Sequence, residues 1–197
     1  MLIYDISQEV FGCKVFPGDP SPVKETMLSI EKGDVCNLTA FRMCAHNGTH
    51  VDAPFHFIDG GKTIDEVSLD KFIGYAYVVE HDGDVTAEDA ERFISSARHF
   101  DEEASYRILV KGKATVTAEA AKVFAREKIK LFGNESQTVG PEDAPKEVHM
   151  IMLGAEIVLL EGIRLGDVPE GMYILNAVPI NLGGSDGAPC RATLLKL

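Results

Sequence analysis

A stretch of eleven residues holds three of the chain's six histidines. It reads H-N-G-T-H-V-D-A-P-F-H and runs from His46 to His56, with His50 and Asp52 between them. The Asn-Gly pair after His46 favours a turn and the Ala-Pro pair after Asp52 favours extended backbone, so we expect a folded loop rather than a helix. Such a loop can direct His46, His50 and Asp52 at one point. Their imidazole nitrogens and carboxylate oxygens suit zinc, manganese or iron.

Metal catalysis requires a bound cation with one position open to water, which is thereby acidified enough to act as hydroxide near neutral pH. Three ligands from the loop leave such a position, and His56 remains as a candidate general acid or base. His149, in a predicted helix, and Glu161, at the end of a predicted strand, could complete a second metal position. These alternatives stay open on sequence alone: His149 could lie on a helix surface, and Glu161 could act as a cap or pair with Arg164.

The chain has the length and composition of one folded domain over residues 1–197. Charged residues make up 25% and hydrophobic residues 45%, which is ordinary for a globular protein and unlike a disordered one. With 31 acidic against 19 basic residues the formal net charge is −12, which repels phosphate backbones and anionic membranes. We therefore expect a small-molecule substrate, and neither nucleic acid nor a membrane as partner.

The N-terminus lacks the basic start and apolar core of a signal peptide, and no window approaches eighteen uninterrupted apolar residues. We therefore expect a cytoplasmic protein. The four cysteines form no Cys-x-x-Cys pair, so we expect buried free thiols rather than a ribbon-type zinc site or a redox dithiol.

Strands and helices alternate along the predicted secondary structure, which favours an α/β fold. Helices are expected after the N-cap candidates Thr86 and Thr117, the second ending near Glu127, and over residues 147–155. A proline at position 179 indicates that the strand containing it lies at a sheet edge or bulges. The predicted strands cover residues 23–30, 35–45, 75–80, 106–110, 129–132, 157–160, 172–182 and 190–197.

The remaining histidines, one arginine and the absence of several motifs also bear on the function. His81, beside an Asp-Gly-Asp turn, and His99, at a predicted helix end, are expected to be surface residues. Arg191 could orient a buried carboxylate or bind an anionic substrate. The chain contains no G-x-S-x-G elbow, no phosphate-binding G-x-x-x-x-G-K-[ST] loop and no dinucleotide-binding glycine pattern, which argues against serine hydrolases and nucleotide-binding enzymes.

The histidine-rich stretch resembles the signature of the cyclase family of metal-dependent hydrolases, which includes bacterial kynurenine formamidases and isatin hydrolases. The pattern H-x-G-T-H-x-D-x-P-x-H is matched in full. Further matching segments are D-I-S at residues 5–7, P-G-D-P at 17–20, L-L-E-G at 159–162, V-P-E-G at 168–171 and D-G-A-P-C-R at 186–191. The similarity therefore extends over nearly the whole chain.

The resemblance implies a role for each candidate residue. His46, His50 and Asp52 would bind a first metal, Asp52 would bridge to a second, and His149 with Glu161 would hold that second ion, while His56 would be the general acid or base. It also implies a swivelling β/β/α fold with a mixed central sheet. Homodimers or homotetramers are expected, with neighbouring subunits helping to wall the site.

The leading hypothesis is a metal-dependent hydrolase of a small amide, formamide or cyclic amide, similar to the arylformamidases of tryptophan catabolism that convert N-formylkynurenine to kynurenine and formate. One or two divalent ions are expected; zinc is favoured and manganese fits the same donors. A second hypothesis is a metal-dependent cyclase or dehydratase that acts through an enolate. A third is a protein that binds metal for structure alone, with a closed coordination shell.

Overall fold

A nine-stranded mixed sheet forms the centre of the molecule. The computed structural model describes residues 1–196, so Leu197, the last residue of the predicted closing strand, lies outside the described residues. The strand order is β1-β13-β11-β5-β7-β9-β10-β4-β12. In that order the strands are β1 (Leu2–Asp5), β13 (Thr193–Lys196), β11 (Gly171–Asn176), β5 (Ile73–Glu80), β7 (Arg107–Lys111), β9 (Leu131–Asn134), β10 (Val158–Glu161), β4 (His50–Asp52) and β12 (Gly187–Pro189).

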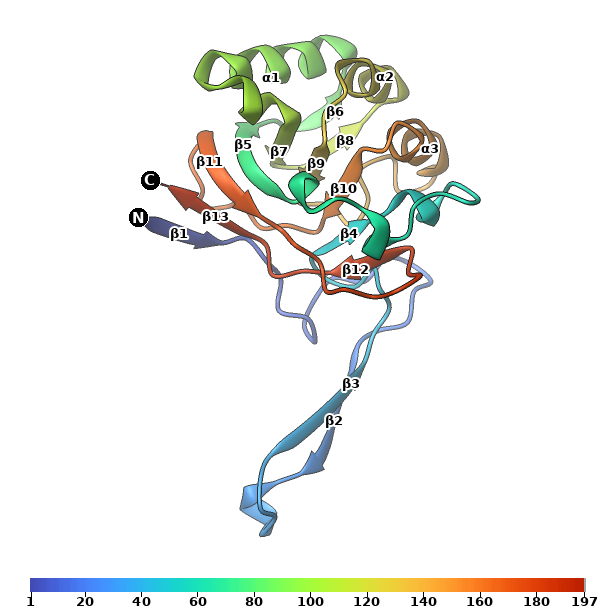
Figure 1. Ribbon diagram of the computed structural model, residues 1–197, viewed down its shortest axis with the longest axis vertical. Coiled ribbons are helices and arrows are strands. Elements are labelled where there is room, and N and C mark those ends of the chain that lie inside the picture. Colours follow the sequence, from blue (N-terminus) through green and yellow to red (C-terminus); the bar gives the residue numbers. More distant parts are fainter. Residues whose placement is uncertain (197) are drawn as a thin grey trace.

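Parallel strands occupy the middle of this sheet, and antiparallel strands flank them on both sides. Strands β5, β7, β9 and β10 pair in parallel, while β4 pairs antiparallel with β10 and β11 pairs antiparallel with β5. The helices α1 (Ala87–Phe100), α2 (Ala118–Glu127) and α3 (Lys146–Gly154) lie together on one side of the sheet (Figure 1). The predicted α/β class and swivelling β/β/α fold with a mixed sheet are confirmed.

Helices α1 and α2 begin where the sequence predicts because threonine side chains cap them. The Thr86 hydroxyl accepts a hydrogen bond from the Asp89 amide, and the Asp89 carboxylate accepts one from the Thr86 amide, which makes a capping box at the start of α1. Thr117 accepts from the Ala120 amide and caps α2 by this one hydrogen bond, without a reciprocal bond. Both helices then turn a narrow apolar face towards the sheet.

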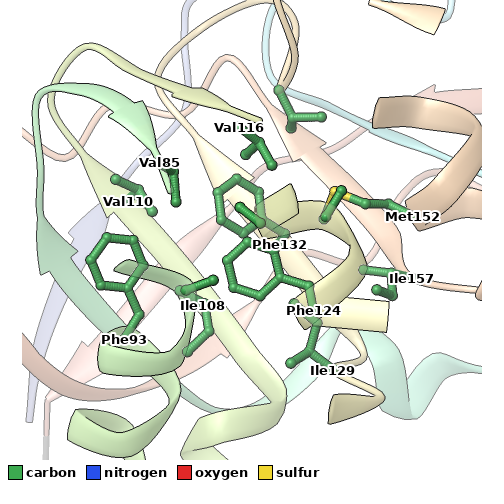
Figure 2. Close-up of a cluster of buried hydrophobic side chains, with 14 of the residues drawn as sticks. Val85, Phe93, Ile108, Val110, Val116, Phe124, Ile129, Phe132, Met152 and Ile157 are labelled. Atoms are coloured by element: carbon green, nitrogen blue, oxygen red, sulfur yellow. The ribbon is translucent and has the colours of Figure 1, made fainter. Parts of the chain in front are cut away.

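Alternation along the strands produces two hydrophobic layers, one on each face of the sheet. On the helix side, Phe93 of α1, Phe124 of α2 and Met152 of α3 pack against Ile108 and Phe132 (Figure 2). The opposite layer contains the intervening strand residues and the loops that follow β10, with members such as Val51, Val78, Leu109, Leu160, Ile163 and Tyr173. The middle strands are therefore buried on both faces, which holds them rigidly.

A hairpin arm projects from this body. It consists of β2 (Val23–Leu28) and β3 (Leu38–Arg42), joined through a short 3₁₀ turn at Ile30–Lys32, and it extends well away from the central sheet (Figure 1). The sequence predicts both strands, and they form a two-stranded sheet of their own, separate from the central sheet. The arm carries exposed apolar side chains, among them Val35, which is 93% exposed.

Some strands differ from expectation. Pro179 does not mark an edge strand: β11 lies between β13 and β5, and the proline follows it, where it forms an isolated bridge with Cys190. Strands of three or four residues show little periodicity, so the sequence does not predict β1, β4, β12 or a small parallel pair, β6 (Gly83–Val85) with β8 (Ala114–Val116). Within residues 1–196, none of the helices is both long and apolar enough to span a membrane.

Candidate metal centre

Two adjacent strands position the centre of the histidine cluster. His50 and Asp52 lie on β4, whereas the sequence analysis expected them in a loop; alternation along the strand directs both to one face, and each side chain is only 1% exposed. Strand β4 pairs with β10, where His50 is the register partner of Glu161. The short strand was missed because it owes its conformation to pairing on both edges, with β10 and β12, rather than to its own sequence.

The carboxylate of Asp52 lies between two sets of histidines. Its Oδ1 atom is 2.8 Å from Nδ1 of His46 and 3.4 Å from Nε2 of His50. Its Oδ2 atom is 3.7 Å from Nε2 of His149. One carboxylate therefore faces both halves of the cluster, as a bridging ligand must.

Glu161 joins the same two halves from the end of β10. Its Oε2 atom is 3.4 Å from Nε2 of His50, and its Oε1 atom is 3.2 Å from Nε2 of His149. Oε1 also accepts a hydrogen bond from the amide of Val139, which fixes the carboxylate. His149 lies on the buried side of α3 and not on the helix surface.

The buried histidines are oriented by backbone carbonyls. Nδ1 of His149 lies 2.8 Å from the carbonyl oxygen of Pro145, and Nδ1 of His50 lies 3.1 Å from that of Gly48. With Nδ1–H donating to these carbonyls, each ring presents Nε2 to the carboxylates. This arrangement, one nitrogen fixed by a backbone acceptor and the other directed at the site, is typical of metal-binding histidines.

The residues of the cluster fit a divalent metal. His46, His50 and Asp52 each offer a donor atom within 4.8 Å of the others, and so do Asp52, His149 and Glu161. Oδ2 of Asp52 is buried yet has no hydrogen-bond partner within residues 1–196. A buried carboxylate oxygen without a partner is strongly destabilising unless a cation binds it, and imidazole with carboxylate is a donor set for zinc or manganese.

His56 and Asp186 lie on the more exposed side of the cluster. His56 ends the 3₁₀ turn Pro54–His56, and its ring stacks on that of His46 at a centroid distance of 4.0 Å. Oδ2 of Asp186 is 2.9 Å from Nε2 of His46 and 3.2 Å from Nδ1 of His56. Asp186 was not among the predicted site residues; the one signal for it was its place in the D-G-A-P-C-R segment.

The neighbouring carboxylates raise the pKa values of the His46 and His50 imidazoles. Burial opposes the charged form of His46, but hydrogen bonds to Asp186 and Asp52 outweigh burial and raise the pKa of this ring to about 11. Burial also opposes charge on His50, whose contacts with Asp52 and Glu161 raise its pKa to about 9. In the metal-free protein, protons on these rings thus neutralise the carboxylates, and binding of a divalent cation must displace protons.

His56 behaves differently from its neighbours. Burial is the main cause that lowers its pKa, and the nearby positive charges of His46 and His149 act in the same direction. The ring is consequently neutral near pH 7. A neutral imidazole whose Nδ1 faces Asp186 can donate from that atom and accept a proton at Nε2.

The other residues that the sequence singles out lie outside the cluster. Arg191 does not orient a buried carboxylate: it pairs with Asp5, and both side chains are largely exposed. Arg164 donates to backbone carbonyls instead of pairing with Glu161. All four cysteines are free, as predicted, but the expected burial is wrong: Cys36 is exposed, and Cys13, Cys44 and Cys190 are half-buried. His99 is exposed, which confirms its prediction as a surface residue. His81 is half-buried, so its prediction as a surface residue is confirmed only in part.

A cavity of about 210 Å³ opens onto the cluster. Its volume is below the usual range for drug-sized ligands, which indicates a small substrate. Its wall brings together the metal-site residues, two aromatic rings and several polar side chains: Phe16, Asp19, His46, His50, His56, Phe57, Gln137, Thr138, Pro145, His149 and Glu161. No lysine or arginine of the described chain lines it.

This fold and site are those of a metal-dependent hydrolase. Residues 4–141 match the protein family described as "Putative cyclase". Curated relatives match over nearly the whole chain: a kynurenine formamidase of Salinibacter ruber is 34% identical, covering 98% of this chain and 97% of the relative, and one of Erythrobacter litoralis is 30% identical, covering 99% and 94%. The chain therefore belongs to the cyclase family, as the histidine signature predicts, and is an amide hydrolase acting outside peptide bonds.

Solved structures agree with this assignment. A "Potential Metal-Dependent Hydrolase With Cyclase Activity" superimposes with a TM-score of 0.80 at 26% identity, covering 98% of this chain and 96% of the other. Isatin hydrolase A from Labrenzia aggregata gives a TM-score of 0.80 at 20% identity, covering 98% and 93%, and so shares the fold. The predicted dependence on a divalent metal is supported by the donor set and by the similarity to the structure described as a potential metal-dependent hydrolase.

Proposed function

We propose that this protein hydrolyses the formamide of N-formylkynurenine to kynurenine and formate. The observation that carries the proposal is the buried cluster in which Asp52 faces His46 and His50 through one oxygen and His149 through the other. The full-length similarity to kynurenine formamidases supports the choice of substrate.

In this proposal two divalent ions occupy the cluster. His46, His50 and Asp52 hold the first, and Asp52, His149 and Glu161 hold the second. The chemistry supplied by a divalent cation there is Lewis acidity, which polarises an amide carbonyl and lowers the pKa of water. Zinc is favoured because neutral imidazole with carboxylate suits it, and manganese fits the same donors.

His56 is proposed to move the protons of the reaction. Its lowered pKa keeps it unprotonated, so Nε2 can accept a proton as water adds to the formyl carbon. The same proton then passes to the leaving nitrogen as the carbon–nitrogen bond breaks, which releases the amine and formate. Asp186 accepts the Nδ1–H of His56 and holds the ring in the tautomer that this exchange requires.

The cavity wall supports a small aromatic amide. Phe16 and Phe57 offer apolar surface to an aryl ring, and Phe57 in turn packs on His149 with ring centroids 4.6 Å apart. A cavity of about 210 Å³ accommodates a single substituted ring rather than a peptide.

Isotope labelling tests hydrolysis directly. Turnover of N-formylkynurenine in water enriched in oxygen-18 should place one solvent oxygen in the released formate. A cyclisation or dehydration through an enolate incorporates no solvent oxygen in this way, and a protein that binds metal only for structure gives no product at all. Either result would contradict the proposal.

A homodimer or homotetramer is also proposed. The arm carries Met27, Ile30, Val35 and Leu38 exposed to solvent, and apolar surface of this kind marks protein–protein contact. Sedimentation equilibrium on the purified protein should give two or four times the chain mass of 21.4 kDa, and the mass of a single chain would contradict the proposal. The cytoplasmic location stays a prediction.

A further inference from the structure

Within the described chain, Asp19 is the one carboxylate in the wall of the active-site cavity that the proposed mechanism does not use. It is half-buried and belongs to the P-G-D-P segment at residues 17–20. The other carboxylate in the wall, Glu161, is a proposed metal ligand, whereas Asp19 is in none of the donor groups of residues 1–196 that could hold a metal. Asp19 therefore brings to the cavity a negative charge that metal binding does not require.

A tight turn fixes the position of Asp19. The amide of Asp19 donates a hydrogen bond to the carbonyl oxygen of Phe16 at 3.1 Å, with Pro17 and Gly18 between them. Gly18 has a φ of +98°, as the third residue of a type II turn requires, and proline is favoured as the second. Phe16 and Asp19, the two ends of the turn, both line the cavity. One short, rigid segment therefore presents an aromatic ring and a carboxylate to the same cavity.

One carboxylate oxygen of Asp19 is held by the segment before His46, and the other is open to a ligand. Oδ2 lies 3.9 Å from Sγ of Cys44, a weak thiol donor. Cys44 is itself fixed by Asn47, whose Oδ1 accepts a hydrogen bond from the Cys44 amide at 2.9 Å. Oδ1 of Asp19 accepts no hydrogen bond from residues 1–196 and is not one of their buried unpaired atoms, so this oxygen is accessible.

The charges of the cavity wall decide what kind of group this oxygen can bind. No lysine or arginine of residues 1–196 lines the cavity, so a negatively charged group of a ligand finds no basic side chain there. A positively charged group forms a charge-assisted hydrogen bond with Asp19, which is roughly twice as strong as a neutral one. Together with the ring of Phe16, the wall favours a ligand that combines an apolar ring with a cationic group.

We propose that Asp19 binds the ammonium group of an amino-acid substrate, which is the α-ammonium of N-formylkynurenine in the proposed reaction. This substrate joins an aryl formamide to an α-amino acid, and its ammonium group carries three N–H donors. With the aryl ring against Phe16, Oδ1 of Asp19 accepts a hydrogen bond from the ammonium group. The assignment rests on the proposed function of the site. It makes Asp19 a specificity-determining residue that separates formamides with an ammonium group from those without one.

Two analogues of N-formylkynurenine separate its charged groups. N-formylkynuramine, formylated on the aryl nitrogen, keeps the ammonium group and lacks the carboxylate, whereas the deamino analogue keeps the carboxylate and has hydrogen in place of the ammonium group. Loss of one hydrogen bond to a charged group lowers kcat/KM about 10- to 100-fold. The metal-loaded wild type should therefore hydrolyse N-formylkynuramine about as well as N-formylkynurenine, and the deamino analogue with a kcat/KM about 10- to 100-fold lower.

Asp19→Asn tests the assignment in the protein. The substitution keeps the shape of the side chain and removes its charge. It should lower kcat/KM about 10- to 100-fold for the two substrates with an ammonium group and less than about 3-fold for the deamino analogue. An equal decrease for all three substrates would assign Asp19 a structural role, and no decrease for the two ammonium substrates would show that Asp19 does not bind them. Either result would overturn the proposal.

Asp59→Asn is the matched control. Asp59 is exposed and lies outside the cavity wall, and its variant has the same change in net charge. It should leave the ratios of the three kcat/KM values unchanged, and a change like that of Asp19→Asn would overturn the proposal. A wild type that hydrolyses all three formamides equally well keeps the proposed function and overturns this inference, whereas a wild type that hydrolyses none of them contradicts both.

Discussion

His50 and Glu161 are register partners across the antiparallel pair of β4 and β10, and their side chains meet with Nε2 of the histidine 3.4 Å from Oε2 of the glutamate. Strand β10 is also paired in parallel with β9, inside the sheet. Two ligands of the proposed metal centre therefore belong to one rigid unit. Donor atoms held in this manner lose little freedom when a cation binds, which favours a preorganised site.

His56→Ala should lower kcat by roughly 10²–10⁴-fold, because the residue is assigned the proton transfer and not metal binding. The measurement is steady-state hydrolysis of N-formylkynurenine alongside the metal content of the same preparation. His99→Ala, which alters an exposed histidine at the end of α1, serves as the control and should keep full activity. Full activity in His56→Ala would show that another group moves the proton.

Asp186→Asn should weaken both metal binding and proton transfer. Asp186 accepts hydrogen bonds from His46, a proposed metal ligand, and from His56, the proposed general acid or base. Loss of such a supporting carboxylate lowers metal affinity or activity about 10- to 100-fold. The negative charge of Asp186 also raises the pKa of His56 against the effect of burial. Removing it should shift the acidic limb of the kcat/KM profile to lower pH.

The control for this change is Asp65→Asn. Asp65 accepts from the amide of Gly184 in the loop that leads to Asp186, yet it lies outside the cavity wall. Its variant should reproduce the wild-type pH profile. An unshifted profile for Asp186→Asn would disprove the contact between this carboxylate and the titrating group.

His149→Ala should reduce the metal content from two ions per chain to one. The second proposed ion loses its one imidazole, whereas His46, His50 and Asp52 keep all three donors of the first. Inductively coupled plasma mass spectrometry after dialysis against metal-free buffer gives the count. Two ions retained in the variant would exclude His149 as a ligand.

Much of the site could be predicted from the sequence because its residues are concentrated in one segment. His46, His50, Asp52 and His56 fall within eleven positions, and their spacing alone indicates a metal centre. The helices were also predictable, since threonine caps and apolar faces are local features. The sequence did not predict that His50 and Asp52 lie on strand β4, because the conformation of this three-residue strand depends on its pairing with β10 and β12.

Asp186 and Gln137 show the limit of the sequence signal more clearly. Asp186 reaches His46 over a separation of 140 residues, and no periodic pattern encodes such a contact. Gln137 is a polar residue in an irregular segment, and only its burial, at 7% exposed, distinguishes it from a surface glutamine. Features of this kind arise from tertiary packing and become visible only in the folded chain.

The metal-free protein should lose stability as the pH rises from about 6.5 towards 9. The pKa of His50 rises from the model-compound value of 6.5 to about 9 on folding, so the folded state holds this proton more tightly. The contribution of this proton to the free energy of unfolding is fully present below pH 6.5 and is lost as the pH rises through about 9. Between these two pH values the free energy of unfolding falls by roughly 1.4 kcal/mol per pH unit for this one proton. Urea denaturation of chelator-treated protein measures it.

The metal-loaded protein provides the comparison for this pH series. Cations replace the protons between the carboxylates, so the loaded form should not follow the same decline, and its stability should exceed that of the metal-free form most strongly near pH 9. Equal stability of the two forms at every pH would contradict metal binding by the buried cluster.

The central claim is that the histidine and carboxylate cluster binds the metal on which formamide hydrolysis depends. The most direct measurement strips the protein of metal, reloads it separately with zinc and with manganese, and follows hydrolysis of N-formylkynurenine with His50→Ala as the control. We expect no turnover without metal, recovery with at least one of the two ions, and no recovery in His50→Ala. Turnover that persists in the stripped protein or in His50→Ala would contradict the account.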